Sequence, residues 1–327
     1  TKSGTLYYPA WLAYAAGYAE KKGHTIDLID AVADDLTIEN VLDRCNHFKP
    51  ELLVVGTSTP SIYNDIEKSI YLKNNIQGNI KIVLVGTHAS SSAHEIIENN
   101  SEIDFVARRE YDATIPHLAN IISSSQDYSI VKGISWRSNE GIVHNEDRDY
   151  IQDLDQLPFA SKLYKRYFTI KNYFYAHVPY PMVSIFTSRG CNAKCDFCVY
   201  PQTMFGKFRA RSPKNIAAEF KWIAEELPEV KGVLIDDDTF TMDQDHAIEV
   251  SKALIKVNNR IPFICEVRAN LKYETMIWLR KAGCKLVVVG FESTDQRILN
   301  NMRKGMKMTL VHQFVEDAKK AKLKVHG

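Results

Sequence analysis

Short apolar runs of strand length alternate with amphipathic stretches along most of the chain, and this alternation restricts the fold more than any other feature. The runs 52–56 and 80–85 are rich in Val, Ile and Leu, and each is closed by a glycine. Between them, over 62–73, apolar residues recur at helical spacing. Apolar strands that alternate with helices of about 10 to 15 residues are typical of parallel sheets covered on both faces. The sequence therefore predicts an α/β protein.

The first 130 residues are expected to form one such domain, a doubly wound open sheet of the Rossmann-like or flavodoxin-like kind. Because no strand precedes the first predicted helix, we expect the first strand to lie upstream of Thr1. The predicted strands are 25–29, 52–56, 80–85 and 103–107, and the predicted helices are 10–22, 36–48, 62–73, 111–122 and one around Ile96 and Ile97.

Residues 131–181 differ in character from what precedes them. Two short apolar runs, 133–136 and 141–144, flank a polar turn and predict a hairpin. The stretch 153–181 lacks clear periodicity and is rich in aromatic residues, so we interpret it as a packed connector across the domain junction rather than a flexible linker.

Residues 182–327 return to β/α units, which predict a partial barrel whose chemistry lies at the carboxyl ends of the strands. The chain has no initiator Met and stops at what reads as the opening of a strand, 324–327. We therefore expect a segment of a longer protein, with the barrel truncated at its C-terminus. The predicted strands are 182–187, 232–235, 263–267 and 286–289, and the predicted helices are 213–226, 246–257, 273–281 and 309–321.

The charge balance is nearly neutral, with 41 Lys and Arg against 40 Asp and Glu. This balance gives no reason to expect nucleic acid as a partner. No stretch approaches the roughly 18 to 20 apolar residues of a membrane helix, so no transmembrane segment is expected. Six cysteines are too few for a secreted disulfide scaffold, and no signal peptide is recognisable.

Three of the six cysteines, Cys191, Cys195 and Cys198, form a C-x3-C-x2-C pattern directly after a predicted strand. Thiolates so close together select zinc, Cu(I) or an iron–sulfur cluster. Structural zinc is almost always closed by four protein ligands, and the remaining cysteines have no paired spacing. Three thiolates on a cluster of four irons would leave one iron open to another ligand. We interpret the triad as a catalytic cluster, with a structural metal as the alternative.

This motif, with Thr-Ser-Arg-Gly before it and the aromatic Phe197 before the third cysteine, resembles the radical S-adenosylmethionine (SAM) superfamily. The resemblance implies a [4Fe-4S] cluster on the three cysteines. It also implies that the amino and carboxylate groups of SAM chelate the open iron. Reductive cleavage would then yield a 5′-deoxyadenosyl radical that removes a hydrogen atom from the substrate.

Other strand ends in this half match the same family. The acidic segment 236–238 resembles Asp-Asp-x-Phe, and 290–293 resembles Gly-x-Glu-Ser. A helix-capping turn is the alternative for the acidic segment, and a surface ion pair is the alternative for Arg268. The basic stretch 207–212 could order the cysteine loop, contact the substrate or form a solvated face. The residues that the resemblance assigns to SAM are Phe197, Asp237, Asp238, Arg268, Glu292 and Ser293.

Three strand-end loops in the first half carry small, hydroxyl and glycine residues that allow a large polar ligand to approach the backbone. With the order of the domains, these loops resemble the cobalamin-binding domain of B12-dependent radical SAM enzymes. Arg109 departs from the pattern, which has Gly there. Because Asp-x-His-x-x-Gly is absent, the resemblance implies a base-off corrinoid without a histidine ligand, and a loop hydrogen bond is the expected role of His88. The residues assigned to cobalamin are Thr57, Ser58, Thr59, Gly86, Thr87, His88, Arg109 and Glu110.

The function implied by the resemblance is a cobalamin-dependent radical SAM reaction, most often methyl transfer to an unactivated carbon. Ring formation, oxidation or rearrangement on the same architecture is one alternative, and a non-catalytic corrinoid-binding protein with a structural metal is another. A methylthiotransferase would need three more cysteines in the first half, which has only Cys45. We expect a small-molecule or lipid-like substrate, an external electron donor of the flavodoxin or ferredoxin type, and a cytoplasmic location.

Overall fold

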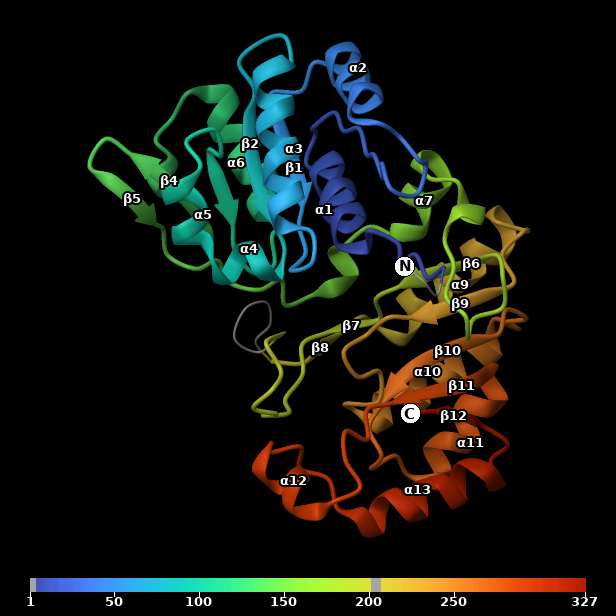
Figure 1. Cartoon of the computed structure of the whole chain (residues 1–327). Coiled ribbons are helices and arrows are strands. Elements are labelled where there is room, and N and C mark those ends of the chain that lie inside the picture. The colour runs from blue at the N-terminus through green and yellow to red at the C-terminus, as the bar shows by residue number, and fades with distance from the viewer. Residues whose placement is uncertain (1–3, 201–206) are drawn as a thin grey trace. The chain divides into compact units, whose positions relative to one another are not determined.

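The computed structural model describes residues 4–200 and 207–327, and the chain divides into two compact units (Figure 1). The N-terminal unit comprises residues 11–151. The C-terminal unit comprises, of the described residues, 4–10, 152–200 and 207–327. Each unit is an α/β body with its own five-stranded sheet.

The sheet of the N-terminal unit is mixed. Strands β1 (Leu52–Gly56), β2 (Lys81–Val85) and β3 (Phe105–Ala107) are parallel, and the hairpin β4 (Ile134–Ser138) and β5 (Gly141–His144) continues the sheet in antiparallel fashion. The predicted hairpin therefore forms and extends this sheet. The helices of the unit are α1 (Ala10–Lys21), α2 (Ile38–Phe48), α3 (Ile62–Asn75), α4 (Thr87–Ser91), α5 (Ala93–Asn99), α6 (Thr114–Ser124) and the 3₁₀ turn η1 (Tyr128–Ile130).

Helices cover both faces of this sheet, as the apolar strands predicted. Alternate residues of β2 point to opposite sides, and each side has its own apolar core. Val83 and Val85 pack with residues of α1 and α6, whereas Ile82 and Leu84 pack with residues of α3 and α5. A strand buried on both faces needs apolar residues at every position.

Two details of the first half differ from expectation. The predicted strand 25–29 is irregular, because the Asp27 carboxylate binds the Arg44 guanidinium at 2.6 and 2.7 Å and the segment joins no ladder. In the described residues the strand order follows the chain from β1 to β5, without the reversal that a doubly wound sheet has at its switch point.

The sheet of the C-terminal unit is entirely parallel in the order β12-β11-β10-β9-β6, which confirms the predicted β/α repeat. Its strands are β6 (Met182–Ile185), β9 (Gly232–Ile235), β10 (Phe263–Val267), β11 (Cys284–Val289) and β12 (Lys324–His326). Its helices after β6 include α9 (Pro213–Glu226), α10 (Gln244–Lys256), α11 (Tyr273–Ala282), α12 (Gln296–Asn301) and α13 (Met308–Lys320). Helix α12 was not predicted.

The aromatic connector packs within the C-terminal unit and contains a helix that its irregular pattern did not predict. Tyr8 stacks between Tyr164 and Tyr173, with ring centroids 4.2 and 3.8 Å away, and its hydroxyl donates to the Met182 carbonyl at 2.9 Å. This stack ties the first residues of the unit to the start of β6. The elements of the connector are η2 (Leu154–Gln156), α7 (Ala160–Tyr167) and η3 (Ile170–Asn172).

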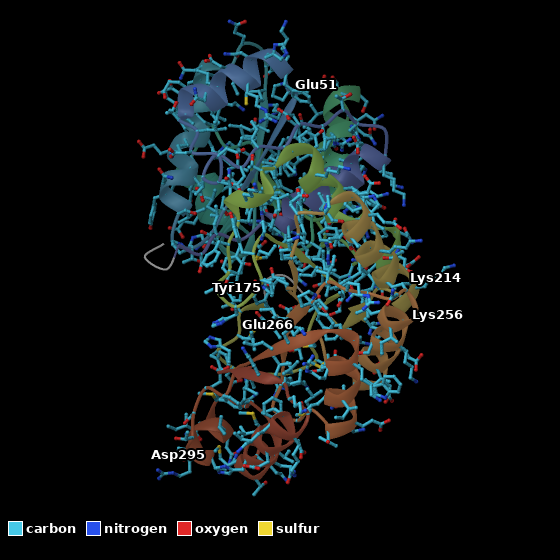
Figure 2. The ribbon with its side chains drawn as sticks, turned by 90° about the vertical axis from the view of Figure 1, so that its right-hand side faces the viewer. Glu51, Tyr175, Lys214, Lys256, Glu266 and Asp295 are labelled. Carbon is cyan, nitrogen blue, oxygen red and sulfur yellow. The ribbon has the colours of Figure 1, made fainter. Side chains whose placement is uncertain are left out.

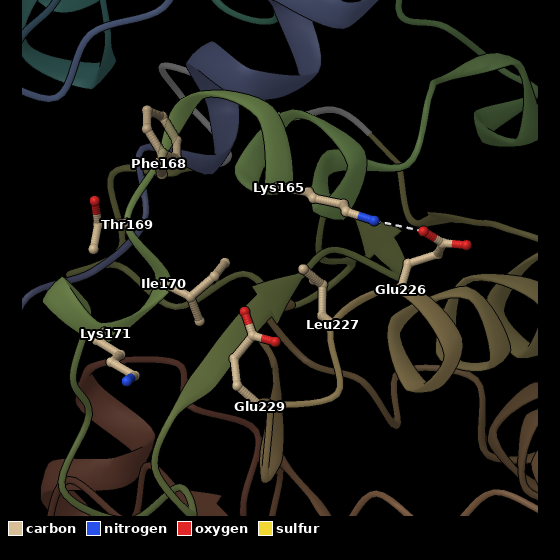
Figure 3. Close-up of a pocket in the computed structure, with 8 residues that line it drawn as sticks. All are labelled: Lys165, Phe168, Thr169, Ile170, Lys171, Glu226, Leu227 and Glu229. Carbon is tan, nitrogen blue, oxygen red and sulfur yellow. Dashed lines mark hydrogen bonds and ion pairs between the residues drawn. The ribbon is translucent and has the colours of Figure 1, made fainter.

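A cavity of about 310 Å³ lies between the connector and the segment that leads into β9 (Figure 3). Lys165 of α7 and Glu226 of α9 form an ion pair at its rim. Because Leu227 and Glu229 precede β9, this cavity lies at the amino end of the sheet, opposite to the strand ends that carry the cysteines. At the bottom of a β/α fold residues serve stability rather than chemistry.

Among the described residues, no helix is both long and apolar enough to cross a bilayer.

Candidate functional site

The cysteine loop begins where β6 ends, and a buried carboxylate holds its first residues. Asp237, at the end of β9, is 2% exposed. Its oxygens accept hydrogen bonds from the backbone N–H groups of Thr187 and Ser188 at 2.6 and 3.0 Å, from the Ser188 hydroxyl at 2.7 Å and from the Thr187 hydroxyl. Burial raises the pKa of Asp237, and these bonds oppose the rise. Asp237 thus supports the loop, and its contact to SAM stays a prediction.

The basic stretch 207–212 orders the loop from its other side instead of facing solvent. Two-residue strands β7 (Ser188–Arg189) and β8 (Arg209–Ala210) pair antiparallel. Arg211 donates to the Phe186 carbonyl at 2.8 Å and forms a buried ion pair with Glu219 of α9 at 2.6 Å. Of the uses that the sequence left open, these contacts support the ordering role.

The three cysteines of the motif are free, half-buried thiols of one loop. Burial raises the pKa of Cys198, and the neighbouring charges of Asp238, Cys191 and Cys195 add to the rise, so the three thiols act on one another electrostatically. In the described residues no three His, Cys, Asp or Glu side chains converge on a single metal-ion position.

Backbone and guanidinium N–H groups point at the cysteine sulfurs. The Ala193 N–H donates to Cys191 Sγ at 3.4 Å, and Arg268 Nη1 donates to Cys195 Sγ at 3.8 Å. In iron–sulfur clusters the cysteines bind as thiolates, and hydrogen bonds to sulfur tune the potential. The donor set of the loop thus fits a cluster of several irons.

A short turn after α12, residues 302–305, braces the same loop and was missed by the sequence analysis. The Met302 carbonyl accepts from the Asp196 N–H at 3.0 Å. Lys304 is 8% exposed; its ammonium lies 5.5 Å from the centre of the Phe197 ring, and its carbonyl accepts from Arg268. The only sequence signal was a cationic residue before Gly305, which is too common to single out.

Glu292 is held by this turn. The Lys304 ammonium binds Glu292 Oε1 at 2.6 Å, and Glu292 itself has a positive φ of 63°. A Cβ on Gly290 would lie 2.5 Å from the same oxygen, which explains the glycine two residues before the glutamate. Ser293 Oγ accepts from the Asp295 N–H at 3.0 Å and so caps the turn into α12. Phe197, Arg268 and Glu292 are therefore brought together around Lys304, while Asp238 lies half-buried after β9.

In the N-terminal unit, the loops after β1 and β2 meet. Thr57 donates through both its N–H and its hydroxyl to the Val85 carbonyl at 2.9 Å. Across this contact the His88 ring nitrogen Nδ1 lies 3.4 Å from Thr59 Oγ1, in the hydrogen-bonding role that we expected for His88. Thr87 and His88 open helix α4 instead of lying in a loop, and Ser58 hydrogen-bonds Ser61 at 2.8 Å.

The loop after β3 adjoins the other two. The Arg109 N–H donates to Ser90 Oγ at 2.9 Å, and its guanidinium binds the Tyr150 hydroxyl at 2.7 Å and Asp147 at 3.1 Å. Arg109 has a φ of 61°, a left-handed conformation that glycine adopts at less cost. The neighbouring Glu110 is buried. All eight residues predicted for cobalamin thus lie at one end of the sheet.

Gly86 gives the first prediction, because its φ is 119° and a Cβ there would clash with the Thr57 carbonyl oxygen. We expect Gly86→Ala to lower the free energy of unfolding by about 2 kcal/mol or more, the sum of backbone strain and clash. Urea denaturation measures the loss. Gly141→Ala is the matched control, since Gly141 has a φ of 129° but open space around it. Equal losses in the two variants would show that the close approach to Thr57 costs nothing.

Two family models match this chain. The model described as the B12 binding domain matches residues 1–119, and that of the Radical SAM superfamily matches residues 185–327. Together they cover more than three quarters of the sequence.

Relatives and solved structures agree with these matches. An uncharacterized methyltransferase of Pyrococcus horikoshii is 28% identical over 99% of this chain and 69% of its own. An anaerobic magnesium-protoporphyrin IX monomethyl ester cyclase of Synechocystis is 28% identical over 91% of this chain and 59% of its own. The cobalamin-dependent SAM radical enzyme OxsB shares the fold at a TM-score of 0.81 with 15% identity, over 99% of this chain and 46% of that one. The chain thus spans between about half and two thirds of the length of these proteins.

Proposed function

This chain belongs to the cobalamin-dependent radical SAM enzymes, and from that premise we propose that it is a C-methyltransferase. When bound, the [4Fe-4S] cluster and SAM would supply a carbon-centred radical, and cobalamin would carry the methyl group. The single observation that carries the proposal is the thiol triad at the carboxyl end of β6, with N–H donors on two of its sulfurs.

The residues of the chain have separate tasks in this proposal. Cys191, Cys195 and Cys198 hold the cluster, and Asp237 keeps the first residues of their loop in place. Arg268 and Glu292, fixed through Lys304, supply a cation and an anion for the charged groups of SAM. Asp238, Phe197 and Ser293 complete the predicted contacts to SAM.

The loops after β1, β2 and β3 are proposed to hold cobalamin. Gly86 lies so close to the Thr57 carbonyl that a side chain would not fit there. The strand ends therefore carry little side-chain bulk, which suits a large planar ligand lying on the backbone. His88 is engaged with Thr59, which supports a corrinoid without a histidine below cobalt. Retention of hydroxocobalamin by His88→Ala, read from the visible spectrum, would support this assignment.

Methyl transfer is favoured over cyclisation because the methyltransferase relative is matched over a larger share of its length than the cyclase. The test is anaerobic reconstitution with iron, sulfide, hydroxocobalamin and SAM whose methyl group carries deuterium. Formation of 5′-deoxyadenosine and a substrate mass gain of one deuterated methyl support the proposal. Loss of hydrogens from the substrate without a methyl gain would support cyclisation. Bound zinc without labile sulfide would contradict both methyl transfer and cyclisation.

We further propose a small-molecule or lipid-like substrate, an external electron donor of the flavodoxin or ferredoxin type, and a cytoplasmic setting. The near-neutral net charge gives no support for a polyanionic substrate. Reduction with flavodoxin and its reductase in place of dithionite, followed by measurement of 5′-deoxyadenosine, checks the donor.

Lys304 gives the second prediction. Replacing it with Met leaves the Glu292 carboxylate without its cation and removes the charge above Phe197. We expect SAM to bind about 10- to 100-fold more weakly, because a lost hydrogen bond between charged groups costs that much. Calorimetric titration of the reconstituted protein measures the change, and Lys304→Arg should recover part of it. Lys307→Met, on an exposed side chain, is the control. Unchanged affinity in Lys304→Met would contradict the positioning role.

A further inference from the structure

The inner face of the C-terminal sheet carries polar side chains that the proposed function does not use. In register, Ser184 of β6 lies beside Leu234 of β9, and Leu234 beside Ile264 of β10. Because side chains alternate along a strand, the next residues on this face are Asp236 and Glu266. The Asp236 N–H donates to the Ile185 carbonyl at 2.9 Å and continues the ladder to that level.

Asp236 and Glu266 lie on the face opposite to the one against which helix α9 packs. The opposite face carries Phe263, whose ring packs edge-on at 5.9 Å against Phe220 of helix α9. Glu266 lies an odd number of residues from Phe263 and therefore points the other way. Figure 2 shows Glu266 near Tyr175, which comes from the connector.

Tyr7 and Tyr175 lie near the two carboxylates. The ring centroids of Tyr7 and Tyr175 are 5.5 Å apart, and their hydroxyls act on each other. The charges of Asp236 and Glu266 act on both phenols. Farther along, His177 lies between Tyr175 and His326 of β12, with ring centroids 5.6 and 4.0 Å away.

The two carboxylates have no cationic partner in the part of the chain that the structure describes. Across residues 4–200 and 207–327, neither Asp236 nor Glu266 forms an ion pair with Lys or Arg, and the other charges that act on Glu266 belong to Asp236, Asp237 and Asp238. Burial and these charges raise the pKa of Asp236 to about 6 and that of Glu266 to about 7. Beneath them, Ser184 is 1% exposed and its hydroxyl has no partner in the same residues.

We propose that Asp236 and Glu266, with the Tyr7 and Tyr175 hydroxyls near them and Ser184 beneath, form a subsite for an ammonium group of the substrate. A half-buried carboxylate among like charges and without a cationic partner is costly, and an ammonium satisfies several oxygen acceptors at once. The faces of the tyrosine rings also attract cations. The subsite rests on the proposed function, since it assigns part of the substrate of that reaction.

The test uses 1,4-diaminobutane as the probe, titrated calorimetrically into the reconstituted protein at pH 6.5 in two buffers of different ionisation heat. We expect binding with release of protons, because a cation displaces the protons that the raised pKa values retain. Glu266→Gln should bind about tenfold more weakly and release fewer protons. Asp236→Asn should do the same, which covers the case in which one variant folds poorly.

Controls distinguish this subsite from a metal site, from a site that binds the uncharged diol equally well, and from the SAM site. Glu274→Gln, an exposed residue of α11, should bind the diamine as the parent protein does. Equal binding of 1,4-butanediol, displacement of the diamine by Mg²⁺, or unchanged binding in both carboxylate variants would overturn the proposal. Competition by SAM would also overturn it, because the ammonium would then be that of SAM. The cluster is assayed separately by iron and sulfide content, so failure of the proposed function is recognised independently.

Discussion

A protein in which Cys195 is replaced by Ser is expected to lose its labile sulfide and most of its iron, and with them all cleavage of SAM. Cys195 is the middle ligand of the proposed cluster, and its sulfur accepts the Arg268 N–H. A serine hydroxyl is a hard, weakly acidic donor and does not replace a thiolate on iron. Iron and sulfide analysis after anaerobic reconstitution, with paramagnetic resonance of the reduced protein, measures the loss.

Cys45→Ala is the matched control, because Cys45 is also a free cysteine but is buried against Leu72, Ile76 and Ile80 in the N-terminal unit. We expect this variant to keep its full iron content and to lose about 1 kcal/mol of stability at most. If Cys195→Ser kept a complete cluster, or if both variants lost iron equally, the assignment of the triad would be wrong.

Replacement of Arg211 by Met is expected to reduce the free energy of unfolding by about 3–5 kcal/mol. The Glu219 carboxylate is fully buried, and its ion pair with Arg211 is its one charged contact among the described residues. Without the guanidinium, the Glu219 carboxylate still accepts hydrogen bonds from the Ser161 hydroxyl at 2.7 Å and from the Ser161 N–H at 3.4 Å. Urea denaturation of the reconstituted protein gives the change.

Two comparison variants sharpen this expectation. The double variant Arg211→Met with Glu219→Gln removes the stranded charge and should recover most of the loss. Arg297→Met, whose side chain is 88% exposed, should change stability by no more than about 0.5 kcal/mol. A loss in Arg211→Met as small as that in Arg297→Met would show that the buried pair does not support the structure.

Arg211 also connects stability to the site. Its N–H donates to the Thr187 carbonyl at 2.9 Å, and its guanidinium donates to the Phe186 carbonyl, so it holds the start of the cysteine loop from the side opposite to Asp237. The sequence pattern marks this basic stretch but does not choose between a buried and a solvated role. The role of the stretch depends on whether α9 places an anion beside Arg211, and this is decided by tertiary packing.

Local sequence patterns predicted most of the helices and strands of the fold. The strands 232–235 and 263–267 and the helix 213–226 were predicted with the bounds that the structure shows. Helix α7 and the irregular segment around Asp27 were not, because their conformation depends on partners distant in the sequence, the tyrosine stack in one case and Arg44 in the other. Apolar periodicity reports only on burial of a regular face.

The sequence by itself determined the α/β architecture, the order of the two domains and the thiol triad, because periodicity and close spacing are local properties of a chain. Only the tertiary structure decided that Asp237 supports the loop, that Lys304 joins Phe197, Arg268 and Glu292, and that Glu266 faces Tyr175. These contacts join residues from different strands and turns. Their energies depend on burial and on charge partners that come together only when the chain has folded.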